Sequence, residues 1–185
     1  MGVEYIDVVN EDGSPAGYSL PRSEIHAKGL WHRVVHVWLI DDKGNLLIQQ
    51  RADNKESHPS LWDISTAGHC EAGMNSRDTA VKELSEELGM QLASADELEY
   101  LFTCRTNHVL KNGLYIDNEL ADVYLLRVAS PIDLTRFKLQ VEEVQAIKLI
   151  HHSQLRVLAE AHDPTFVPLA GDYVQFFNIL ATRYP

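Results

Sequence analysis

The stretch GHCEAGMNSRDTAVKELSEELGM, residues 68–90, decides the fold of this 185-residue chain. Apolar residues in its second half recur at helical spacing and predict a helix over Arg77–Leu88. Asn75 or Ser76 can cap the start of this helix, and Gly89 follows it immediately as a stop signal. The stretch therefore predicts a glycine-containing loop that leads into an amphipathic helix.

Three glutamates of this helix project from one side. Glu83, Glu86 and Glu87 stand at positions i, i+3 and i+4, and Lys82 is the cation next to them. Such a run is commonly a solvated helix face, but it is also a set of oxygen ligands for Mg²⁺ or Mn²⁺. The preceding loop favours the cation site, because Gly68 allows a close approach of its backbone carbonyl to an ion held by the helix.

Hydrophobic runs outside this stretch predict strands, and the order of elements indicates an α+β or layered α/β/α arrangement. The residues between 23 and 33 are polar and read as irregular. Two further helices are expected, over 152–162 and near the C-terminus. The expected strands are residues 3–9, a short return over 18–20, a hairpin of 34–40 with 46–51, re-entry near 61–68, and then 100–105, 120–128 and 143–150.

The whole pattern resembles the Nudix box, Gly-x5-Glu-x7-Arg-Glu-U-x-Glu-Glu-x-Gly-U, where U is aliphatic. Here it reads Gly68-x5-Met74-x7-Lys82-Glu83-Leu84-x-Glu86-Glu87-x-Gly89-Met90. Two positions depart from the family, namely Met74 in place of Glu and Lys82 in place of Arg. In the family these two residues largely form an ion pair between loop and helix, so their joint replacement looks like a rewired structural contact. The three glutamates of the helix are intact.

The resemblance extends over about residues 3–150. The order HRVVHVWLIDDKGNLLIQQRADNKESHPSLWDISTAGH, residues 32–69, is similar to the Nudix branch related to isopentenyl-diphosphate isomerase. This resemblance implies the Nudix fold, a mixed β-sheet between helices with a loop–helix–loop metal site. A single domain over 1–185 is expected, with a core of about 30–165, an N-terminal hairpin over 3–20 and a C-terminal helix over 172–183.

The resemblance also implies site residues. Gly68, Glu83, Glu86, Glu87 and Glu119 would hold Mg²⁺ or Mn²⁺, and either Glu86 or Glu119 would act as the catalytic base. Asp117 and Glu119 alternate along an extended segment, so both can face one side.

A second metal site is implied by three histidines whose order and approximate spacing match the isomerase branch. They are His26, His32 and His69, and Asp117 would join them. A single histidine is more often a structural hydrogen-bonding residue than a ligand. Arg51 and Arg33 are expected to contact a diphosphate, whereas Lys55 reads as a solvated cation.

Three functions remain open at this point. The first is metal-dependent hydrolysis of a diphosphate linked to another moiety. The second is isopentenyl-diphosphate isomerisation, which in the resembling family needs a cysteine where this chain has Ala67; Cys70 stands three residues later. The third is a non-catalytic diphosphate-binding module, suggested by Met74.

Composition narrows the choice of partners and compartment. The hydrophobic share is 45% and no apolar run is long enough to span a bilayer, so no membrane partner is expected. The formal net charge of −11 argues against nonspecific nucleic-acid binding, and an anionic small-molecule substrate would need a bridging cation or a local basic patch. Two cysteines fit a reducing, cytoplasmic setting. A homodimer is compatible with the sequence.

Overall fold

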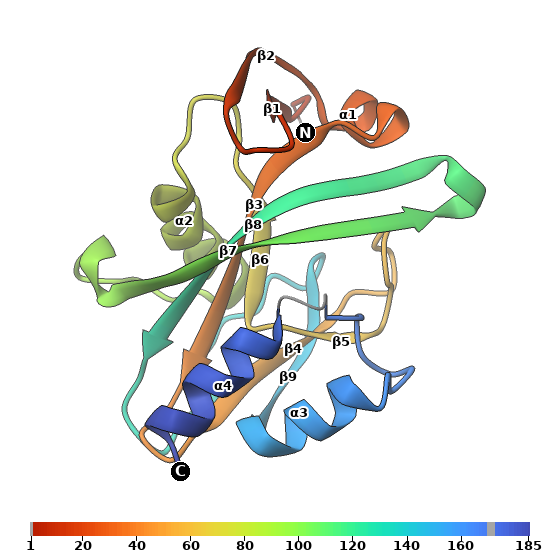
Figure 1. The fold of residues 1–185 in the computed structure, drawn as a ribbon. Coiled ribbons are helices and arrows are strands. Elements are labelled where there is room, and N and C mark those ends of the chain that lie inside the picture. The colour runs from red at the N-terminus through yellow and green to blue at the C-terminus, as the bar shows by residue number, and fades with distance from the viewer. Residues whose placement is uncertain (1, 170–172) are drawn as a thin grey trace.

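The computed structural model describes residues 2–169 and 173–185 (Figure 1). The strands form one mixed sheet, and the helices lie on its faces. The elements are β1 (Tyr5–Val9), β2 (Pro15–Pro21), α1 (Arg22–Lys28), β3 (Trp31–Ile40), β4 (Asn45–Arg51), β5 (Trp62–Asp63), β6 (Thr66–His69), α2 (Ser76–Leu88), η1 (Ala95–Glu97), β7 (Leu98–Leu110), η2 (Lys111–Gly113), β8 (Tyr115–Arg127), η3 (Leu134–Arg136), β9 (Val144–His151), α3 (His152–Glu160) and α4 (Val174–Arg183).

The sheet has two limbs that diverge from a short junction. β3 and β4 pair only at Leu39–Leu47 and Ile40–Leu46. Beyond this junction, β3 pairs with β6 and β8, while β4 pairs with β5 and β9 (Figure 1). The space between the limbs is therefore not closed by backbone hydrogen bonds, and side chains from both limbs can line it.

Helices cover both faces of the sheet, which confirms the predicted α+β sandwich (Figure 1). On one face, α2 buries Leu84 and Leu88 against Val37 of β3. On the other face, α4 packs Phe176 on Trp38, with the two ring centroids 4.7 Å apart. Burial of several such side chains, each contributing about 1.5–3 kcal/mol, stabilises the two outer layers on the sheet.

The central helix forms as predicted. The side chain of Asn75 accepts a hydrogen bond from the backbone N–H of Asp78, so α2 begins at Ser76, one residue before the expected start. Gly89 ends the helix in the left-handed conformation with φ +65°, which a glycine adopts without a steric penalty.

Three regions differ from the expectation in their extent. Residues 22–28 form a helix rather than an irregular segment, because Ile25 is fully buried with Ile6 and Val8 in a small cluster of its own. β7 and β8 each have 13 residues and form a long hairpin. Both strands extend beyond the expected ranges, because more exposed and more buried residues alternate at their ends and the hydrophobic runs did not reveal this pattern. The C-terminal helix is α4; residue 172, its expected start, lies outside the described residues.

None of the helices in the described ranges is both long and apolar enough to span a bilayer.

Candidate functional site

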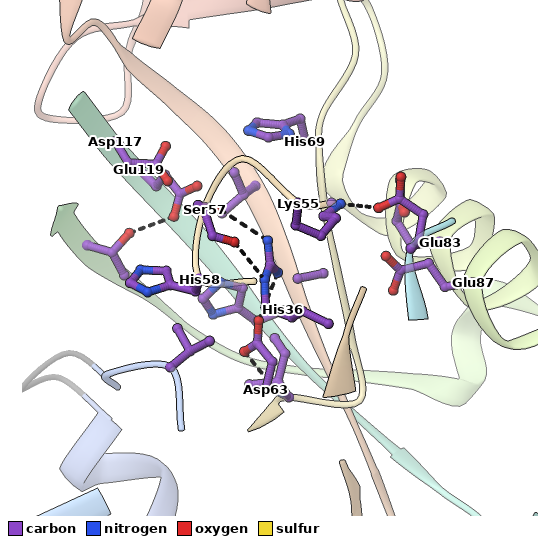
Figure 2. Close-up of a pocket in the computed structure, with 18 of the residues that line it drawn as sticks. His36, Lys55, Ser57, His58, Asp63, His69, Glu83, Glu87, Asp117 and Glu119 are labelled. Carbon is purple, nitrogen blue, oxygen red and sulfur yellow. Dashed lines mark hydrogen bonds and ion pairs between the residues drawn. The ribbon is translucent and has the colours of Figure 1, made fainter. Parts of the chain in front are cut away.

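A cavity of about 370 Å³ opens between the two limbs of the sheet. Figure 2 shows Glu83 and Glu87 on one side and Asp117 and Glu119 on the other, with Lys55 from the loop before β5 between them. Carboxylates, histidines and cations therefore converge on one hollow from elements that are distant in the sequence.

Glu83 and Gly68 lie in close contact. A Cβ placed on Gly68 would lie 2.2 Å from the carboxyl carbon of Glu83, so only glycine leaves room for this carboxylate. Burial raises the pKa of Glu83 to about 8, and the neighbouring Glu87 adds to the effect. A buried carboxylate with a raised pKa gains from a cation, so the pair fits the expected ligand set of carbonyl and carboxylate oxygens.

Glu87 is buried deeper and is held by two polar side chains. Its Oε2 accepts hydrogen bonds from Thr66 Oγ1 at 2.5 Å and from Gln49 Nε2 at 3.2 Å. Burial nevertheless raises its pKa to about 7. Sequence reasoning missed Thr66 and Gln49, because their role depends on the packing of α2 against β4 and β6.

Glu86 lies at the mouth of the cavity, where half of its side chain is exposed. Lys82 Nζ is 3.5 Å from Glu86 Oε2 and 2.5 Å from Glu71 Oε1. The Lys82–Glu71 pair joins the helix to the preceding loop, and the backbone N–H of Met74 donates to the carbonyl of Glu71. The loop–helix contact is thus made by Glu71 instead of residue 74, as a rewired ion pair would require.

Glu119 lies with the histidines, not with the glutamates of α2. Its Oε2 accepts a hydrogen bond from Thr106, and its Oε1 is 4.0 Å from His32 Nε2. Burial raises the pKa of Glu119 to about 8, and Asp117 raises it further. Glu119 was expected in one ligand set with the helix glutamates, and its direct contacts are with Thr106 and His32.

The three predicted histidines and Asp117 do come together. His26, His32, His69 and Asp117 each place one ligand atom within 4.8 Å of the others. They come from α1, β3, β6 and β8. Asp117 Oδ1 is 3.1 Å from His26 Nδ1 and 3.7 Å from His32 Nε2.

Several polar atoms of this cluster are buried without a well-formed hydrogen bond, although His32 Nδ1 bonds the carbonyl of Leu30 at 3.0 Å. Nε2 of His26, His32 and His69 has no hydrogen-bond partner within the described part of the chain, and the contact between His26 Nδ1 and Asp117 Oδ1 lacks hydrogen-bond geometry. Burial lowers the pKa of His32 to about 4 and that of His69 well below its usual value. Neutral imidazoles beside a carboxylate are the donor set that Zn²⁺ or Mn²⁺ accepts, and buried unpaired polar atoms are otherwise costly.

Basic side chains line the same cavity. Arg51 donates to Asp63 Oδ2 at 3.0 Å and, at 3.1 Å each, to the carbonyl and the hydroxyl oxygen of Ser57, which leaves two of its five guanidinium hydrogens for a ligand. Lys55, expected to be solvated, lines the cavity and pairs with Glu143. Arg22 also lines it, and its buried Nε has no hydrogen-bond partner among the described residues.

Arg33 does not reach the cavity. It pairs with Asp122 at 2.7 Å on the α2 side of the sheet, and it is absent from the lining. Alternation along β3 explains this, because His32 and Val34 face one side and Arg33 the other. Sequence reasoning missed Arg22, because nothing in the polar stretch that follows it, residues 23–33, indicated that Arg22 lies beside the histidines.

The sequence of this chain is similar to those of known proteins. The model of the NUDIX domain family matches residues 30–170. Nudix hydrolase 3 of Arabidopsis thaliana is 41% identical over 186 residues, which cover 99% of this chain but only 24% of that protein, so the chain spans about a quarter of its length. An isopentenyl-diphosphate Delta-isomerase of Escherichia coli is 29% identical over 135 residues, 72% of each chain.

Solved structures share the fold. A crystal structure from Deinococcus radiodurans superposes with a TM-score of 0.67 at 19% identity and covers 98% of this chain and 100% of its own. The NUDIX domain of NrtR from Shewanella oneidensis, crystallised with ADP ribose, gives a TM-score of 0.55 at 16% identity, with 83% and 88% covered.

Proposed function

Because the chain belongs to the Nudix family, whose curated relatives include named hydrolases, we propose that it hydrolyses a diphosphate linked to another moiety with the help of Mg²⁺ or Mn²⁺. The observation that carries the proposal is the meeting of buried carboxylates with Arg22, Arg51 and Lys55 in one cavity. Carboxylates alone would repel a diphosphate, and cations alone would not hold a divalent ion. Together they suit a complex of both.

Different residues of the chain would bind the metal ion and the phosphoryl oxygens. Glu83, Glu87 and the carbonyl of Gly68 would hold the ion, with Glu86 at the mouth. Bound there, Mg²⁺ supplies charge compensation for phosphoryl oxygens and a position for a water molecule. Arg51 and Lys55 would bind the phosphoryl oxygens that face the loop before β5.

A carboxylate would take the proton from the attacking water. Glu119 is half-buried and accepts one hydrogen bond from Thr106; burial and Asp117 raise its pKa to about 8, so without a metal it is mostly protonated near neutral pH. Glu86 is half-exposed and lies 3.5 Å from the Lys82 ammonium. Because Glu86 stands on α2 with Glu83 and Glu87 whereas Glu119 lies with the histidines, we propose Glu86 as the base for a water on an ion held by α2.

The experiment is a screen of nucleoside diphosphates, sugar nucleotides, dinucleotides and prenyl diphosphates with Mg²⁺. We expect turnover of at least one class, and a loss of about 100-fold or more in Glu87→Gln, which removes an ionised ligand. Glu160→Gln is the matched control, because Glu160 is exposed on α3 and pairs with Arg156 one helical turn away. Metal-independent turnover, or full activity of Glu87→Gln, would contradict the proposal.

We also propose that His26, His32, His69 and Asp117 form a second metal site. Its test is the stoichiometry of bound Mn²⁺ or Zn²⁺ in the wild type and in His69→Ala. Loss of one equivalent in the variant is expected, whereas unchanged stoichiometry would refute the site.

Isomerisation of isopentenyl diphosphate is the second candidate, and the isomerase relative is the observation that favours it. Ala67 lines the cavity but has no thiol. Cys70 packs in the apolar cluster under α2, and burial raises its pKa to about 11, so it is no substitute. Formation of dimethylallyl diphosphate from isopentenyl diphosphate would establish this candidate.

A binding module without catalysis is the third candidate, suggested by Met74. Its expected signature is diphosphate binding in calorimetry that does not depend on Mg²⁺. The Lys82–Glu71 pair weakens this candidate, since it keeps the loop tied to the helix in spite of Met74.

The setting of the protein is also proposed. Cys70 and Cys104 are both buried, which suits a reducing cytoplasm. A homodimer is proposed as the oligomeric state, and light scattering at several concentrations would measure it.

A further inference from the structure

His36 and Tyr173 form a polar pair in the lining of the cavity, with Tyr173 buried and His36 half-buried. His36 lies on β3, directly opposite Ala67 of β6, and Tyr173 immediately precedes α4. Both residues line the cavity, and Figure 2 shows His36 near Asp63, below the acids of β8. Neither residue belongs to the two sets of metal ligands, so the hydrolysis proposed above leaves the pair without a role.

The pair is connected by one short hydrogen bond. His36 Nδ1 lies 2.6 Å from Tyr173 Oη. Burial lowers the pKa of His36 to about 4 and raises that of Tyr173 well above its usual value, so both groups are neutral near pH 7. One hydrogen atom is therefore shared between the two atoms.

The place of the remaining donor decides which atom carries that hydrogen. If His36 Nδ1 donated to Oη, the buried tyrosine O–H would have no acceptor among the described residues. If Tyr173 donates to Nδ1, the remaining donor is the imidazole Nε2–H, and His36 lines the cavity, where a ligand can accept from it. The second arrangement leaves no donor enclosed without a partner, so the hydrogen of the imidazole is assigned to Nε2.

Nε2–H is consequently a donor available to the cavity. His36 lines the hollow, and Nε2 has no partner within the described ranges. A donor in a buried pocket is left unsatisfied by a hydrocarbon and is satisfied by an oxygen or nitrogen acceptor. Pockets built to form such a bond discriminate strongly against ligands that lack it.

From this geometry we infer that His36 is a specificity-determining residue, which donates from Nε2 to an acceptor on the moiety joined to the diphosphate, while Tyr173 positions it. The substrate class is therefore a diphosphate of a hydroxyl- or carbonyl-bearing moiety rather than of a pure hydrocarbon. The inference rests on the proposed function only in assuming that a diphosphate occupies this cavity.

The test is calorimetric binding of two probes in the presence of Mg²⁺, with hydrolysis followed separately. ADP-ribose carries many acceptors, and isopentenyl diphosphate has none outside its diphosphate. We expect the wild type to bind ADP-ribose at least about tenfold more tightly. His36→Phe should weaken ADP-ribose binding about tenfold and leave the affinity for isopentenyl diphosphate within about twofold.

Two further variants separate specificity from structure. His36→Gln keeps an N–H donor near the place of Nε2, so it should retain most of the preference. Tyr173→Phe frees the tautomer of His36 and should reduce the preference by a smaller factor, which keeps the test usable should His36→Phe not fold. The midpoint of thermal unfolding is measured for each variant, since a purely structural role would lower it without changing the ratio of affinities.

The outcomes are distinct. Equal weakening of both probes, no change in either, or a wild type that binds isopentenyl diphosphate as tightly as ADP-ribose would overturn the inference, as would failure of both probes to bind. Selective binding without hydrolysis would support the inference and defeat the proposed hydrolase activity. Hydrolysis without a preference that depends on His36 would do the opposite.

Discussion

Gly68→Ala separates metal binding from folding. The added Cβ would stand 2.2 Å from the carboxyl carbon of Glu83, and the three nearest atoms all belong to that side chain. Unstrained carbon atoms approach to about 3.5 Å, so the carboxylate has to retreat by roughly 1.3 Å. Ligand distances to Mg²⁺ are held near 2.0–2.1 Å, and a displacement of this size breaks the bond.

The expected loss of Mn²⁺ affinity is about 100-fold, equivalent to about 2.7 kcal/mol. The fold should tolerate the change, because the displaced group is the end of a flexible side chain and Gly68 has no positive φ. Moving a buried carboxylate towards water removes an unfavourable burial, and alanine restricts the unfolded chain by about 0.4–1 kcal/mol. The free energy of unfolding without metal should therefore stay the same or rise.

Mn²⁺ titration followed by electron paramagnetic resonance measures the affinity, and urea unfolding with a chelator measures the stability. Gly2→Ala is the matched control, since Gly2 also lines the cavity but has open space around its Cα. In a Glu83→Gln background, Gly68→Ala should add little further loss. Unchanged Mn²⁺ affinity in Gly68→Ala would refute the assignment of Glu83 as a ligand, and a large loss of stability would refute the claim that only Glu83 has to move.

Two further predictions concern charge. The pKa of Glu83 is raised to about 8 in the folded protein from an ordinary 4.5, so the folded state holds a proton that the unfolded chain releases. Without metal, this contribution to stability is present at low pH and is lost as pH rises through about 8. Mg²⁺ should therefore raise the melting temperature more at about pH 9 than at about pH 6. An equal shift at the two pH values would contradict the reasoning. Arg51→Gln leaves Asp63 as a buried uncompensated charge and should cost about 3 kcal/mol in urea unfolding, most of it recovered by adding Asp63→Asn.

Spacing rules predict elements whose residues are close along the chain, whereas the contacts between distant segments were predicted from the family resemblance. Helical spacing, a cap and a stop residue suffice for α2, because each acts within a few residues. The clustering of His26 with Asp117 joins α1 to β8, and no spacing rule reaches that far; only the resemblance suggested it. Arg33 is the instructive failure, since period-two alternation with His32 already placed it on the opposite face of β3.

One face of β3 carries both the hydrophobic core and the cavity, and the transition between them explains how a stable protein can hold so many buried charges. Trp38 and Ile40 lie under α3 and α4 and are almost fully buried, whereas His32 and His36 lie further along the same face. On the N-terminal side of Leu39, β3 diverges from β4. The layer of helices α3 and α4 that covers this face ends where the two limbs of the sheet separate. Tyr173 stands at that border, packing against Trp38 while bonding His36. Beyond this border a ligand or ion can complete the bonding of buried polar atoms, and His32 Nε2 of β3 lies there together with unpaired atoms of His26, His69 and Asp117 from other elements.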